Sequence, residues 1–151
     1  MKNSLTLWAT HRAQLQVWFE KFTPEQLNHI PTGFSNNLIW NLGHVLVTQQ
    51  ALVYRLSGLD VTVPAIITDA YKKGTRPEAV IDTPSIQQIQ QLLLHTTEQT
   101  LLDAEKGVFK EFQPYTTLLG FQLQSVEEAI QFNTYHEALH LGIMMQIRKF
   151  L

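Results

Sequence analysis

Hydrophobic residues recur every three or four positions in four long segments of the chain, which is the spacing of an amphipathic helix. In the first segment, Leu5, Trp8, Leu15 and Trp18 form an apolar stripe, and Arg12 is expected to lie off it. The alternation of apolar and polar residues that is typical of a β-strand is weak everywhere. The pattern therefore predicts four helices, over about residues 4–22, 35–57, 83–105 and 126–151.

Residues that begin and end helices mark the same boundaries. Ser125 and Glu128 have the spacing of a capping box, in which each side chain accepts a hydrogen bond from the other residue's backbone. Thr23 precedes a proline, which predicts one short extra turn of helix after the first segment. The other predicted caps are Ser35 or Asn36 and Asp82, and the predicted stops are Gly58 and Gly107.

Two long connections separate these helices. Residues 59–82 contain two prolines and a glycine, and loops of this length in compact domains usually have a function or are disordered. Residues 108–124 are rich in apolar side chains but are broken by Pro114 and Gly120, which predicts a packed loop with short extended pieces. The pattern predicts an all-α fold, a four-helix bundle that forms one domain over residues 1–151.

Composition excludes several classes of function. The chain has 11 basic and 13 acidic residues, a formal net charge of −2, so it has no basic surplus for nucleic acid. Cysteine is absent, which excludes disulfides, thiolate metal sites and a cysteine nucleophile. No window reaches the ~18 apolar residues of a membrane span. We expect a cytoplasmic protein that acts through histidine, carboxylate, hydroxyl or metal chemistry.

Two histidines in the last predicted helix indicate a metal site. His136 and His140 are four residues apart, so both rings lie on one helix face and can reach one ion. Phe132 and Ile143 share that face, so the rings point into the bundle, where imidazole nitrogens need polar partners. The alternative is a pair of core histidines that are held by hydrogen bonds.

The same residues spell the zinc-protease motif His-Glu-x-x-His, in which Glu137 would be the general base. We reject a protease because that site needs a further ligand downstream, and residues 141–151 contain no His, Asp or Glu. No strand-rich subdomain is evident that would hold a peptide. A third ligand must come from another helix, and Glu137 is expected beside the site or at its edge.

His44 is the best candidate for the third ligand. It lies in the apolar first half of the second predicted helix, next to Gly43, which lets a neighbouring backbone approach closely. His11, His29 and His95 are expected at the surface. Three neutral imidazoles leave open coordination positions, as in catalytic sites, and they favour Zn²⁺ or Ni²⁺ over Mg²⁺ or Ca²⁺.

Three stretches of the chain resemble the DinB-like superfamily. Residues 37–45 (Asn-Leu-Ile-Trp-Asn-Leu-Gly-His-Val) and 135–143 (Tyr-His-Glu-Ala-Leu-His-Leu-Gly-Ile) look like its second-helix and last-helix signatures, and residues 70–77 are similar to its mid-loop. The resemblance covers nearly the whole chain. It implies a four-helix bundle with one long crossover, usually a homodimer, and a divalent metal held by three histidines. These map onto His44, His136 and His140.

The characterised members of that family include S-transferases that use bacillithiol, mycothiol or glutathione, and a maleylpyruvate isomerase. The resemblance therefore favours a metal-dependent enzyme acting on a small molecule, by thiol transfer with a low-molecular-weight thiol as co-substrate. The alternatives are a metal-dependent hydrolase and a non-catalytic bundle that binds a metal or ligand. No residue pattern selects between these reactions.

Two groups of residues are candidates for the rest of the site. The first would support the metal ligands or transfer protons, against the alternative that they are ordinary helix residues. The second would lie at the mouth of the pocket, where the connection over residues 59–82 folds back. The cations of that connection, Lys72, Lys73 and Arg76, would pair with a substrate carboxylate, against the alternative of a solvated charge run. The first group is Glu137, Asn41 and Tyr135, and the second is Tyr71, Lys72 and Arg76.

A homodimer is the assembly that the resemblance implies, and the low share of charged residues predicts apolar helix faces. Trp8, Trp18 and the Phe150-Leu151 end are candidates for the interface, although the inside of the bundle is the expected place for each tryptophan. Light scattering at micromolar concentration should give twice the mass of one chain. The mass of a single chain would contradict the dimer.

Overall fold

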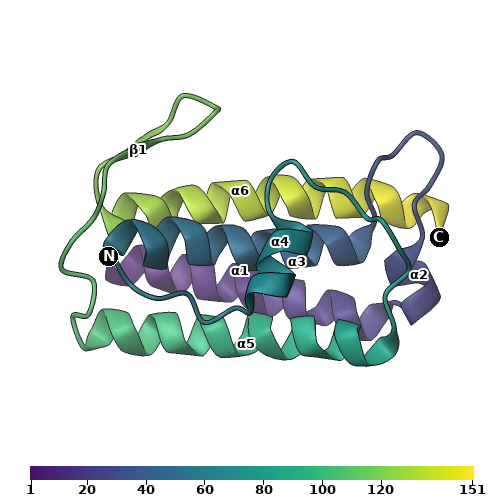
Figure 1. Ribbon diagram of the computed structural model, residues 1–151, viewed down its shortest axis with the longest axis horizontal. Helices are drawn as coiled ribbons and strands as arrows, with labels where there is room; N and C mark the ends of the chain where they lie inside the picture. The colour runs from purple at the N-terminus through teal and green to yellow at the C-terminus, as the bar shows by residue number, and fades with distance from the viewer.

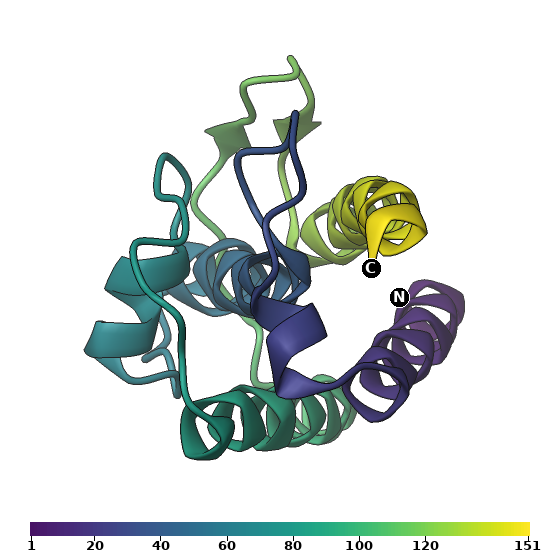
Figure 2. The ribbon, with the colours of Figure 1, turned by 90° about the vertical axis from the view of Figure 1, so that its right-hand side faces the viewer.

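A computed structural model describes residues 1–151, and four long helices run along its longest axis (Figure 1). Seen from the end, α6 packs against α1 and α3, and α5 packs against the same two helices from the other side (Figure 2). α3 and α6 run in opposite directions. The predicted all-α bundle is confirmed, with α1 at Lys2–Lys21, α3 at Leu38–Gln49, α5 at Thr83–Glu105 and α6 at Val126–Ile147. None of its helices combines the length and the apolar character that crossing a bilayer requires.

The connections contain short elements. The long connection over residues 59–82, predicted without regular structure, folds one helix, α4, that packs against α3. The region over residues 108–124 forms the expected extended pieces, which pair as an antiparallel hairpin that projects from the bundle (Figure 1). The short elements are α2 (Pro24–Asn28), α4 (Ala65–Tyr71), β1 (Tyr115–Thr116), β2 (Gln122–Leu123) and a last 3₁₀ turn (Arg148–Phe150).

Side chains cap the helices close to the predicted places. Thr23 and Asp82 both accept hydrogen bonds from backbone N–H groups of the helices they precede. For α3 the prediction is wrong by one or two residues, because Asn37 rather than Ser35 or Asn36 accepts from the backbone of Trp40, at 2.9 Å. Ser125 accepts from the backbone of Glu128 as expected, but the Glu128 carboxylate accepts from Gln124 N–H, so only half of the capping box forms.

Beyond α3, the helix that carries His44 continues first with π-helical and then with 3₁₀-helical geometry. A π turn over Gln50–Tyr54 is followed by a 3₁₀ turn over Arg55–Ser57. Gly58 then ends the helix with a φ of +70°, which only glycine adopts without strain, so the predicted stop is confirmed. The π turn begins one residue after Gln49, whose buried amide donates to Thr100 of α5 at 3.0 Å.

The core consists of two apolar clusters, one toward each end of the bundle. The larger contains the second half of α1, most of α3 and the first half of α5, and the smaller contains the first half of α1 and the start of α6. Buried polar residues separate the clusters along the helices. Several of them come from facing helices, so the middle of the bundle can hold a polar site: His11, Arg12, His44, Gln49, Thr96, Thr100, Asn133 and Glu137.

Candidate metal centre

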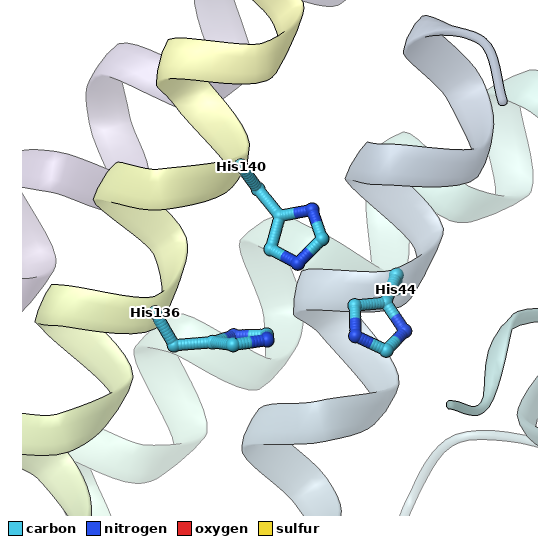
Figure 3. Close-up of side chains that lie close together, drawn as sticks. All are labelled: His44, His136 and His140. Carbon is cyan, nitrogen blue, oxygen red and sulfur yellow. The ribbon is translucent and has the colours of Figure 1, made fainter. Parts of the chain in front are cut away.

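Three histidines from two antiparallel helices converge in the middle of the bundle. One ring nitrogen each of His44, His136 and His140 lies within 4.8 Å of the other two. The three ring centroids are 4.6–5.3 Å apart. His44 projects from α3 toward the two rings of α6 (Figure 3). The sequence prediction that these three side chains come together is confirmed.

The His44 ring is held on one face and at one nitrogen. Its ring stacks on the indole of Trp40, one turn earlier in α3, with centroids 4.8 Å apart and planes 9° from parallel. Its Nδ1–H donates to the backbone carbonyl of Tyr71 at 2.7 Å. This tautomer leaves Nε2 unprotonated, so it accepts from the Thr48 hydroxyl at 3.3 Å. A metal ion would take the place of that hydroxyl donor.

Gly43 lets α4 approach α3 closely enough for that hydrogen bond. A Cβ atom at position 43 would clash with the ring of Tyr71, which packs against the glycine. The sequence predicted that a neighbouring backbone would approach Gly43 closely. In the structure the side chain of Tyr71 makes that close approach instead. The same packing presents the Tyr71 carbonyl to His44.

His140 is oriented in the same way by a buried amide. Its Nδ1–H donates to Oδ1 of Asn41 at 2.8 Å. The Asn41 amide is itself fixed, because its Nδ2 donates to the backbone carbonyl of Asn37 at 2.7 Å, and the side chain has no exposed surface. Asn41 thus selects the His140 tautomer whose Nε2 is unprotonated.

Of the three rings, His136 has the fewest hydrogen-bond partners. Its Nδ1 is buried and has no hydrogen-bond partner in the protein. A buried polar nitrogen without a partner costs about 1–3 kcal/mol, so the site is incomplete without a bound group. His136 also has a stacking contact with Phe132, one turn earlier in α6, at 6.1 Å between centroids.

Burial keeps all three rings neutral, which is the form that binds metals. It lowers the pKa of His136 to about 4, with smaller contributions from His44 and Arg12, and that of His140 to about 3, with contributions from His136 and His44. Burial also lowers the pKa of His44, although the hydrogen bond to the Tyr71 carbonyl acts in the opposite sense. All three are therefore unprotonated near pH 7.

This donor set fits a divalent ion. A tetrahedral ion with metal–nitrogen bonds of about 2.1 Å places its ligand atoms roughly 3.4 Å apart, within the 4.8 Å limit of this group. Two of the three rings have their other nitrogen hydrogen-bonded, as metal-binding histidines generally do. Three protein ligands would leave at least one coordination position open.

The comparison with protein families agrees with this geometry. Residues 7–144, which include all three histidines, match the DinB superfamily. The chain belongs to the DinB superfamily. No curated protein sequence matches it. The helical bundle and the histidine triad that the DinB resemblance implies are both present.

Three residues were expected to support the metal ligands of this DinB-superfamily site, and only Asn41 forms a hydrogen bond with one of the three histidines. Tyr135 is 43% exposed and packs on Phe121 and Phe132, with ring centroids 5.2 and 6.0 Å away, so its assignment to the site is corrected. It has no hydrogen bond to the triad. The cause is its position in α6, one residue before His136 and therefore on a different face of the helix.

Glu137 faces the core between α1 and α6 instead of the edge of the site. Its two oxygens accept from Nε of Arg12 at 2.9 and 3.0 Å, and one also accepts from Nη2 of Arg12 at 2.7 Å and from the Trp8 indole at 3.0 Å. The expectations that Arg12 lies off the apolar stripe and that His11 is at the surface are wrong, because both are buried beside Glu137. His29 and His95 are exposed, as predicted.

A cavity of about 150 Å³ opens beside the triad. His44 and His136 line it, together with Thr48, Lys73 and residues of the β1–β2 hairpin. The connection over residues 59–82 lines this cavity through Lys73, and none of Tyr71, Lys72 and Arg76 lines it. The Tyr71 ring is buried against Gly43, Lys72 pairs with Asp69 at 2.9 Å in the adjoining cavity, and Arg76 lines a different cavity together with Trp40.

The sequence prediction included Lys73 among the cations of the loop, but it missed Thr48 and the hairpin. The position of Thr48 four residues after His44 was a usable signal, because it places both side chains on one face of the same helix. The hairpin carries no comparable signal. It is separated from His44 by some seventy residues and reaches the cavity only through the tertiary fold.

Substitution of Gly43 should weaken the site through α4. We expect Gly43→Ala to displace the Tyr71 ring, remove the carbonyl from His44 and lower metal affinity about ten-fold, which calorimetric titration measures. Gly142→Ala is the matched control, because an added Cβ there meets no atom within 4 Å, although Gly142 lies only two residues after His140. Equal metal affinity in the two variants would contradict this role of Gly43.

Substitution of Asn41 should weaken the site through His140. Asn41→Ala removes the acceptor of the His140 Nδ1–H, and losses of this kind typically lower metal affinity about 10- to 100-fold. Asn41→Asp keeps an acceptor oxygen at the same place and should retain most of the affinity. Competition with a chromophoric chelator measures both, and an unchanged affinity in a folded Asn41→Ala protein would exclude the role.

Proposed function

We propose that this protein is a metal-dependent enzyme that joins a low-molecular-weight thiol to a small-molecule partner. The observation that carries the proposal is a histidine triad with open coordination positions beside a cavity that no carboxylate lines. When bound, a divalent ion, Zn²⁺ or Ni²⁺, supplies Lewis acidity that lowers the pKa of a thiol or water in an open position.

The lack of a free carboxylate favours a thiol over water. A thiol has an ordinary pKa of about 8.5 and water one of 15.7, so a thiol needs a much smaller shift to ionise near pH 7. Hydrolases of this kind commonly use a carboxylate as general base. Glu137, the carboxylate in the His-Glu-x-x-His string, has both oxygens occupied by Arg12 and has no exposed surface.

The residues of the chain would orient and enclose the reactants. The Tyr71 carbonyl and Asn41 hold the protons on Nδ1 of His44 and His140, which leaves both Nε2 atoms unprotonated. The Thr48 hydroxyl, next to His44 Nε2, can donate to or accept from a reactant there. Leu52, Leu118 and Leu119 give the cavity an apolar wall against which a reactant would pack.

The proposal is tested with protein stripped of metal and reloaded with Zn²⁺ or Ni²⁺. Glutathione, bacillithiol, mycothiol and cysteine are each mixed with 1-chloro-2,4-dinitrobenzene. In the reaction the thiolate sulfur forms a bond to the ring carbon, and chloride leaves with the electrons of the broken C–Cl bond. The thiol proton passes to the buffer. We expect turnover with at least one thiol, lost on chelation and in His140→Ala, and kept in His95→Ala, whose ring is exposed on α5.

Other results would favour the alternatives. Metal-dependent cleavage of a nitrophenyl ester without any thiol would support a hydrolase in place of the transferase. Metal binding with neither reaction would support a non-catalytic binding bundle.

We also propose that the chain forms a homodimer. Support comes from apolar side chains exposed along α1 and α6, where Leu7 is 62% exposed and Tyr135 and Leu139 are each 43% exposed. Trp8 and Trp18 are buried in the bundle, which is the place expected for each tryptophan, so neither contributes to the proposed interface. Phe150 is 60% exposed and remains available for contact.

A further inference from the structure

We propose that the substrate of this site is an elongated small molecule with an apolar middle and an anionic group at the end away from the triad, where Lys73 and Arg55 bind it. The inference rests on the proposed function, because it assumes that the reacting end lies at the histidines. It adds the chemical class of the substrate and two residues that select it.

The cavity at the triad continues outward as a groove. A second cavity, of about 350 Å³, shares four of its lining residues with the first: Thr48, Leu52, Lys73 and Tyr115. His44 and His136 line only the inner cavity, and Arg55 and Lys72 line only the outer one. A ligand bound along both would therefore have one end at the triad and the other among basic side chains.

Apolar side chains form the inner part of the groove. Leu52 and Phe132 line it from the bundle, and Leu118 and Leu119 line it from the tip of the hairpin. Leu118 is 79% exposed and Leu119 is 60% exposed. Leucines that are exposed beside a cavity gain by being covered, so an apolar segment of the ligand is favoured next to them.

The outer part of the groove is electrostatically unbalanced. It contains three basic residues and a single acidic one, Asp69, whose carboxylate already pairs with Lys72 at 2.9 Å. Lys73 and Arg55 have no ion-pair partner. An anionic group, either a carboxylate or a phosphate, would pair with them, whereas a cationic group would be repelled.

Three thiols that differ only at the far end test this charge preference. Protein stripped of metal and loaded with Co²⁺ is titrated with 6-mercaptohexanoate, 6-mercaptohexanol and 6-aminohexanethiol, and binding is followed by the change in the Co²⁺ absorption spectrum. We expect the carboxylate thiol to bind about three- to five-fold more tightly than the alcohol, and the amine to bind most weakly. High salt should reduce the preference.

Matched variants test whether Lys73 and Arg55 cause the preference for the carboxylate thiol. Lys73→Met and Arg55→Met should each reduce it, and the double variant should abolish it, while Lys106→Met, an exposed lysine outside the groove, should keep it. Equal affinity for the three thiols, or no spectral change with any of them, would overturn the inference. Failure of the protein to bind Co²⁺ would instead overturn the metal site on which the proposed function depends.

Discussion

Wild-type protein that has been stripped and reloaded is expected to hold one equivalent of divalent metal per chain, and His44→Ala, His136→Ala and His140→Ala proteins are expected to lose it. Each ring would supply one of three protein ligands. Structural zinc sites with four ligands have binding free energies of about 10–16 kcal/mol, so one ligand is worth about 3 kcal/mol, or two orders of magnitude in affinity. Elemental analysis after dialysis measures the metal content.

His95→Ala is the control for this experiment, because that histidine is exposed on α5 and far along the chain from the triad. Circular dichroism must show that each variant keeps its helices. A folded His136→Ala protein that keeps a full equivalent of metal would contradict the site. Reloading after chelation is essential, because histidine sites acquire nickel during affinity purification and follow the affinity order of the metals.

Removal of one partner of the buried Arg12–Glu137 pair is expected to be the most destabilising substitution in the chain. Both side chains are buried, with exposed fractions of 1% and 0%, and each substitution leaves a charge without its partner. Arg12→Met or Glu137→Leu should lower the free energy of unfolding by about 3–5 kcal/mol. Urea denaturation of metal-free protein measures this effect separately from metal binding.

The double variant distinguishes a charge effect from a packing effect. Arg12→Met combined with Glu137→Leu removes both charges and should recover much of the lost stability, because two apolar side chains of similar volume fit the same space. Asp69→Asn, which breaks the exposed pair with Lys72, should cost less than about 1 kcal/mol. Additive losses in the double variant would show that the pair itself contributes little.

The Arg12–Glu137 pair also explains why the zinc-protease string is misleading in this chain. In an α-helix, His136 and His140 share one face, while Glu137 points about 100° away from His136. In this bundle that direction leads to α1, where Arg12 donates to both carboxylate oxygens and Trp8 donates to one of them. The motif describes only the spacing along one helix, and the neighbouring helix decides what the glutamate does.

The sequence by itself was sufficient for the four long helices, most of their boundaries and the three histidines. Those features depend on local rules, because helical period, capping side chains and the i, i+4 spacing all act within a few turns. Gly58, Asp82 and Ser125 act at the predicted ends. His44 could also be found, because its helix is apolar enough to indicate burial.

Only the tertiary structure decided which residues surround the triad. Tyr71 contributes its backbone carbonyl rather than its side chain. Of the loop cations, only Lys73 lines the cavity beside the triad. Arg12 is buried because it pairs with a carboxylate from a distant helix. The physical reason is that burial of a polar side chain is costly unless a partner satisfies it. That partner lies far along the chain, so no local pattern reveals it.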